Sequence, residues 1–164
     1  MPEKATLQRA RRDTRQGKAA TTQAGEFVRE EMHHIRSGKH GARSTKQAIA
    51  IGLSKARRAG VRLRPPRPGQ AKPKTRQSAR YASRAAGRGR RKPARKRSRS
   101  IARALQREGR GAASGRALAR QARQAAQRRG RTARQAAARK AVATKGRRGR
   151  KAAAKKAAAT RQAA

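Results

Sequence analysis

Three histidines and two adjacent glutamates lie within eleven residues, and their side chains could bind a metal ion or transfer a proton. They are Glu30, Glu31, His33, His34 and His40. Neighbouring positions on a helix point about 100° apart, so neither the adjacent histidines nor the adjacent glutamates face each other. No thiol or carboxylate completes an evident metal set, and no nucleophile or phosphate-binding loop accompanies the glutamates. The sequence therefore predicts no metal site, no cofactor and no enzymatic activity.

Phosphate neutralisation is the chemistry that the composition favours. The 164 residues include 50 Lys+Arg and only 6 Asp+Glu, for a formal net charge of +44. Duplex DNA carries one charge per roughly 1.7 Å of axis, so this charge matches that of about 20–25 base pairs. Cysteine is absent, which excludes a disulfide framework and thiolate metal sites. We therefore expect a nucleic-acid partner, with DNA favoured over RNA, and no small-molecule substrate.

The candidate phosphate-binding residues fall into one group near a predicted helix and two clusters farther along the chain. The first group is Arg43, Lys46, Lys55, Arg57 and Arg58. The second consists of Arg88, Arg90, Arg91, Lys92, Arg95, Lys96, Arg97 and Arg99, and the third of Arg147, Arg148, Arg150 and Lys151. No regular aromatic residues are interleaved with these cations, so base stacking on aromatic platforms is not predicted. The pattern indicates phosphate contacts without sequence readout.

An anionic membrane is the competing partner for so basic a chain. Binding in the membrane interface requires a broad apolar helix face, which the basic segments lack. No apolar signal segment follows the N-terminus, and no apolar run approaches the length of a membrane span. We therefore expect a cytoplasmic, nucleoid-associated protein and no membrane partner.

The clearest helix that could position these cations spans residues 45–60. Ser44 and Gln47 form a capping-box pattern, in which each side chain satisfies an unpaired amide of the first turn. Ile49 and Leu53 then share one face of the helix. Gly60 lies where a left-handed residue would end the helix.

A second helix is predicted over residues 22–37, and a weaker one over 5–16. The apolar residues of the second helix are Phe27, Val28, Met32 and Ile35, and they would form a small core with those of the helix at 45–60. The short connection favours an antiparallel pair. A helix-turn-helix that reads bases is an alternative, but the turn is long and only Gln47 and Arg43 suit base contacts.

Beyond Leu63 the composition changes. Residues 64–74 hold four of the six prolines and are predicted to form a linker. Residues 75–164 contain a single acid, Glu108, and few apolar side chains larger than alanine, which is typical of disorder. The predicted fold is mainly α: a basic lead-in (1–20), a small helical head (21–63), the linker, and a largely disordered cationic arm (75–164) with transient helices.

The stretch GEFVREEMHHIRSGKHGARSTKQAIAIGLSKARRAGV resembles a family of small basic bacterial proteins of unknown function, some of which are labelled DNA-binding. That resemblance implies nucleic-acid binding but supplies no catalytic residue. By composition alone, residues 75–164 resemble the tails of linker histones and of bacterial linker-histone-like proteins. They differ in being rich in Arg where those tails are rich in Lys.

These observations favour sequence-independent DNA binding and compaction by phosphate neutralisation. Two alternatives stay open. An RNA-binding or ribosome-associated protein would share this composition, because basic segments also order on RNA. An adaptor would use the helical head to recruit a protein partner to nucleic acid.

Overall fold

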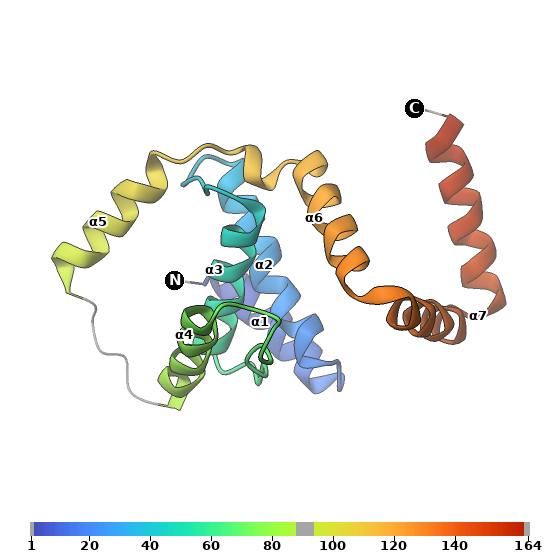
Figure 1. Cartoon of the computed structure of the whole chain (residues 1–164), viewed down its shortest axis with the longest axis horizontal. Helices are drawn as coiled ribbons and strands as arrows, with labels where there is room; N and C mark the ends of the chain where they lie inside the picture. The colour runs from blue at the N-terminus through green and yellow to red at the C-terminus, as the bar shows by residue number, and fades with distance from the viewer. Residues whose placement is uncertain (1, 88–93, 163–164) are drawn as a thin grey trace. The chain divides into compact units, whose positions relative to one another are not determined.

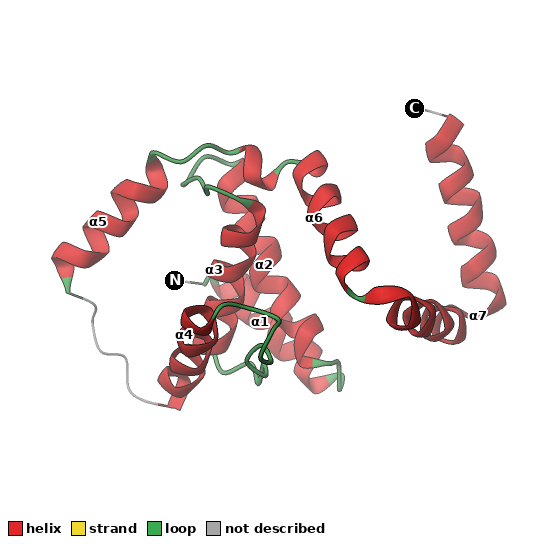
Figure 2. Cartoon of the chain, viewed as in Figure 1, coloured by secondary structure: helices red, strands yellow, loops and turns green. Residues whose placement is uncertain are grey.

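The computed structural model describes residues 2–87 and 94–162, and the regular structure in this part of the chain is helical throughout (Figure 2). The elements are α1 (Lys4–Arg15), α2 (Ala20–Arg36), α3 (Thr45–Arg58), α4 (Pro73–Arg84), η1 (Ala85–Gly87), α5 (Arg95–Gln106), η2 (Gly111–Ala113), α6 (Gly115–Arg128) and α7 (Gly130–Gln162) (Figure 1). The chain divides into an N-terminal unit, Met1–Ala119, and a C-terminal unit, Arg120–Ala164.

The predicted disordered arm is wrong, because helices α5, α6 and α7 occupy most of the described residues after 94. Alanine, arginine, lysine and glutamine are all strong helix formers, and that propensity outweighs the shortage of apolar residues. The predicted linker is also partly helical. Pro73 begins α4 at a first-turn position, where its missing N–H costs nothing. The fold is therefore a helical protein in two units, in place of a head with a disordered arm.

Helices α2 and α3 pack side by side and carry the core of the N-terminal unit (Figure 1). Phe27 and Ile35 of α2 are buried, with 1% and 0% of their surfaces exposed. Two clusters form: one of Ala10, Ala24, Phe27 and Ala56, and one of Met32, Ile35, Ala42, Ala48 and Ala113. Val28, Ile49 and Leu53 are partly buried against these clusters. The core thus extends beyond the predicted pair, to α1 at one end and to residue 113 at the other.

A glycine sets the spacing between α2 and α3. A Cβ atom on Gly52 would lie 2.8 Å from the Val28 Cα and 3.1 Å from the Phe27 carbonyl oxygen. The two helices therefore approach more closely than any side chain at position 52 would allow. The buried Ala48 and Ala56, one turn to either side, keep the same face of α3 small.

The end of α5 and the segment that follows it return to the loop between α2 and α3. The Gly41 amide donates to the Leu105 carbonyl (2.8 Å), and the Ala42 amide donates to the Gly109 carbonyl (3.1 Å). The Thr45 hydroxyl donates to the Ala112 carbonyl at 2.7 Å. Residues 105–113, which we call the return segment, thereby complete the core cluster that contains Ile35.

The C-terminal unit consists of the end of α6 and of α7, and almost all of its described side chains are exposed. Helix α7 is interrupted at Gly146, where φ is 59° and ψ is −177°. A positive φ of this kind is accessible to glycine without strain, so Gly146 joins two helical segments within α7.

Candidate nucleic-acid interface

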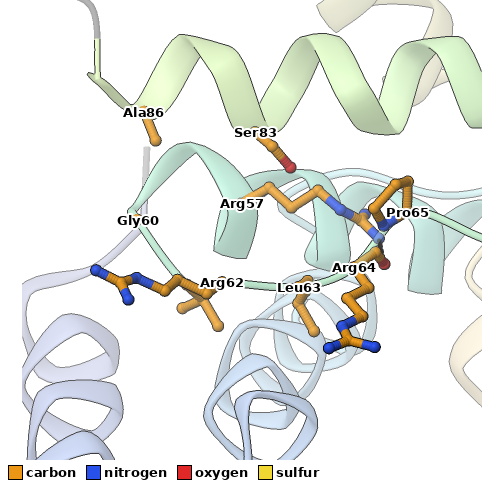
Figure 3. Close-up of a pocket in the computed structure, with 9 residues that line it drawn as sticks. Arg57, Gly60, Arg62, Leu63, Arg64, Pro65, Ser83 and Ala86 are labelled. Atoms are coloured by element: carbon orange, nitrogen blue, oxygen red, sulfur yellow. Dashed lines mark hydrogen bonds between the residues drawn. The ribbon is translucent and has the colours of Figure 1, made fainter.

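A cavity of about 400 Å³ lies at the C-terminal end of α3 in the N-terminal unit (Figure 3). Three arginines contribute to its lining, which consists of Arg57, Gly60, Val61, Arg62, Leu63, Arg64, Pro65, Ser83 and Ala86. The irregular segment after α3 forms one side, and α4 with η1 forms another. A cavity with this many cations and no carboxylate in its lining favours an anionic ligand.

Arg57 is the buried cation of this cavity. Only 8% of its surface is exposed, and its Nε has no hydrogen-bond acceptor. Its second terminal nitrogen donates to the Arg64 carbonyl at 3.5 Å, the long limit of a hydrogen bond. Burial lowers the pKa of Arg57, yet a guanidinium stays protonated in proteins. A buried, charged donor without an acceptor is costly, and a phosphate oxygen would satisfy it.

Arg62 and Arg64 are exposed on the segment that follows α3. Figure 3 shows the Arg57 guanidinium beside Arg64 and Pro65, whereas Arg62 extends toward the Gly60 end of the cavity. Sequence reasoning missed both arginines because they lie beyond the predicted helix end. Their position directly after a helix with four candidate cations is the feature of the sequence that could have indicated them.

The structure places the predicted cations of the α3 region in different environments. Arg43, Lys46 and Arg58 are exposed and available to phosphates. Lys55 is instead engaged inside the unit, where its ammonium lies 2.5 Å from a carboxylate oxygen of the buried Glu31. Arg57 lines the cavity.

The two predicted clusters of the arm lie in different units. Arg95, Lys96, Arg97 and Arg99 are all exposed on α5. Arg150 and Lys151 are exposed on α7. Arg147 and Arg148 belong to the same helix, but their side chains lie outside the described ones, and Arg88, Arg90, Arg91 and Lys92 lie outside the described residues altogether.

The described ion pairs are confined to the N-terminal part of the chain. Among the described side chains, every ion pair lies between residues 3 and 55. Arg9 pairs with Glu26 at 2.5 Å, and Lys18 pairs with Asp13 at 2.7 Å. The cations of α5, α6 and α7 whose side chains are described therefore keep their charge available for an external anion.

A second group of polar residues joins α2 to the N-terminus and to the following loop. Glu3 accepts hydrogen bonds from His34 Nε2 (2.8 Å) and from the Lys39 ammonium (2.9 Å). These contacts, with the His34 hydrogen bond the largest cause, lower the pKa of Glu3 to about 2. Nearby, Glu31, His34 and His40 each place one potential ligand atom within 4.8 Å of the others. Sequence reasoning weighed adjacent residues only, and it missed that Glu31 and His34 share a helix face at a spacing of three.

No helix in the described ranges combines the length and the apolar character that crossing a bilayer requires. No curated protein and no solved structure matches the chain. A family of unknown function, DUF6496, matches residues 15–67, a stretch that contains α2, α3 and all of the cavity lining except Ser83 and Ala86.

Proposed function

We propose that this protein binds duplex DNA without reading its sequence and compacts it, as a nucleoid-associated protein. The observation that carries the proposal is the set of exposed cations on α5, α6 and α7, which no described acid neutralises. Residues 120–164 alone hold 16 basic residues and no acidic one. At one duplex charge per 1.7 Å, these 16 charges match about 27 Å of duplex axis.

The distribution of charge around α7 supports compaction. With about 100° between successive helical residues, the first segment of α7 carries exposed cations at about 0°, 80°, 180° and 300° around its axis. These residues are Arg131, Arg139, Lys140 and Arg134. A helix with cations on every side can contact phosphates of two duplexes at once, whereas a one-sided stripe would serve a single duplex. The compositional likeness to linker-histone tails supports the same role.

The cavity at Arg57 would serve as a defined phosphate-binding site, whereas the exposed cations elsewhere would contact the duplex diffusely. Phosphate contacts of this kind fix orientation on the duplex and carry no sequence information. Exposed Arg43, Lys46 and Arg58 on or beside α3 would extend the contact along the backbone.

The decisive experiment is a salt titration of DNA affinity with variants in α7. Replacing Arg131, Arg134, Arg139 and Lys140 with Gln removes four charges from one helical segment. If all four contact phosphates, the slope of log K against log salt should become shallower by about 3.6, at about 0.9 per contact. A matched variant with Lys at all four positions keeps the charge and should keep the slope.

Two results would count against the proposal. An equal loss of DNA affinity in the Lys and the Gln variants would mean that guanidinium geometry, and not charge, governs binding. Tighter binding to structured RNA than to duplex DNA at the same salt concentration would favour an RNA-binding protein. Random-sequence and defined-sequence duplexes should bind equally well, because no base readout is involved.

A further inference from the structure

The carboxylate of Glu31 is fully buried, and neither of its oxygens accepts a hydrogen bond of good geometry. Oε2 lies 2.5 Å from the Lys55 ammonium, which compensates its charge. Oε1 faces His40 Nε2 at 3.3 Å. A buried carboxylate oxygen without a hydrogen-bond donor is costly. No protein group donates a hydrogen bond of good geometry to Oε1 among the described residues, so a bound cation would stabilise it.

The hydrogen bonds of the two histidines fix where their lone pairs lie. His40 Nδ1 is 3.0 Å from the Gly41 carbonyl, which can only accept, so Nδ1 carries the proton. In the neutral ring, His40 Nε2 then turns a lone pair toward Glu31 Oε1. His34 Nε2 is 2.8 Å from the Glu3 carboxylate and likewise donates, which leaves the lone pair of His34 on Nδ1.

This arrangement is the one that metal-binding histidines adopt. Such a histidine donates its other ring N–H to a carboxylate or a backbone carbonyl, which fixes the tautomer. His34 donates to a carboxylate, and His40 donates to a carbonyl. The ammonium of Lys55 forms an ion pair with the second oxygen of the third candidate ligand, Glu31, and so holds that carboxylate in place.

One distance in this group matches that between two ligands of a small ion. With Zn–N and Zn–O bonds of about 2.0–2.2 Å, tetrahedral ligand atoms lie about 3.3–3.5 Å apart. Glu31 Oε1 and His40 Nε2 are 3.3 Å apart, within this range. One potential ligand atom from each of the three residues lies within 4.8 Å of the others, so His34 would approach by at most about 1.5 Å on metal binding. We propose that Glu31, His34 and His40 bind one divalent transition-metal ion, with Zn²⁺ the best match to two imidazoles and one carboxylate.

Such an ion would tie α2 to the loop that carries His40. That loop also holds Gly41 and Ala42, which pair with the return segment. The metal would therefore stabilise the N-terminal unit at the point where residues distant in sequence meet. The competing arrangement is an internal ion pair, in which a doubly protonated His40 and Lys55 together neutralise Glu31.

The test uses the full, untagged chain stripped of metal with chelator and then titrated with Zn²⁺ alone or with Co²⁺ as a coloured probe. We expect one equivalent to bind, an increase in thermal stability with Zn²⁺, and the visible absorption bands of four-coordinate Co²⁺. His40→Gln and His34→Gln should each weaken binding by more than about 100-fold, since even supporting residues contribute about 10–100-fold. His33→Gln is the matched control, because His33 is exposed on the same helix, and its affinity should be unchanged.

Each other outcome overturns the assignment. No Co²⁺ absorption and no Zn²⁺-dependent stabilisation would leave the internal ion pair as the correct description. Equal losses with His33→Gln and His40→Gln would show non-specific binding to surface imidazoles. Loss with His34→Gln but not with His40→Gln would place the ion among Glu3, Glu30 and His34, the neighbouring group with similar spacing. Circular dichroism of the metal-free variants identifies any that fail to fold.

Discussion

Substituting Gly52 with Ala should destabilise the protein, although alanine is the better helix former. An added Cβ would lie 2.8 Å from the Val28 Cα, which is a backbone atom and cannot rotate away. Overpacking of this kind costs about 1–3 kcal/mol. The gain in helix propensity offsets about 0.8–1 kcal/mol of that cost. We therefore expect a net loss of up to about 2 kcal/mol in the free energy of unfolding.

Gly25→Ala is the matched control. Gly25 lies inside α2 and is exposed, and nothing lies within 4 Å of the position where its Cβ would be built. The Gly25→Ala substitution should stabilise the protein by about 0.5–1 kcal/mol. Because the gain in helix propensity is common to both variants, the difference between their free energies of unfolding isolates the packing cost between α2 and α3.

Urea unfolding followed by far-UV circular dichroism measures both variants, at a salt concentration high enough to exclude nucleic acid. Equal stabilisation by the two substitutions would refute the close approach of α2 and α3. A loss with Gly25→Ala as large as that with Gly52→Ala would refute it as well, because no neighbour of Gly25 could account for the loss.

Two further predictions concern charged groups. In the metal-free protein, the contribution of Glu3 to stability should be fully present above its ordinary pKa of 4.5 and lost as the pH falls toward about 2. Glu3→Gln should remove that part of the pH dependence, and acid unfolding of the two proteins measures it. Arg57→Met should raise the unfolding temperature in phosphate-free buffer, because it removes a buried charge whose Nε has no acceptor. It should also weaken DNA binding. Arg58→Met is the control, because Arg58 is exposed and its replacement should change stability little. A lower unfolding temperature for Arg57→Met would contradict the interpretation that Nε of Arg57 is buried without an acceptor.

Local features of the sequence were the predictable ones. The Ser44 hydroxyl accepts from the Gln47 amide at 3.2 Å, and the Gln47 side chain reaches back to the Arg43 amide at 2.9 Å. The capping box was therefore predictable from the sequence. The Gln47 side chain bonds to the amide of Arg43, one residue before the Ser44 amide that the motif specifies. Ile35 and Phe27 were recognisable as core residues because helical spacing brings large apolar side chains onto one face.

Non-local features were not predictable, for physical reasons that differ from case to case. The return segment contacts the α2–α3 loop mainly through backbone carbonyls and alanines, and neither leaves a hydrophobic pattern in the sequence. Helices α5 to α7 were missed because net charge was weighed above propensity. The Glu31–His40 contact depends on how the loop after α2 folds back, and no spacing rule encodes that path.

The return segment also has a consequence for how the chain is made. Residues 105–113 follow the end of α3 by about fifty residues, and chains grow at about 5–20 residues per second. The α2–α3 pair must therefore wait roughly 3–11 s after its own synthesis for the segment that covers Ile35 and Ala42. During that interval a nascent chain exposes an apolar face beside a lengthening run of positive charge. Slower translation of this stretch should extend the period in which chaperones and nearby RNA compete for the unfinished unit.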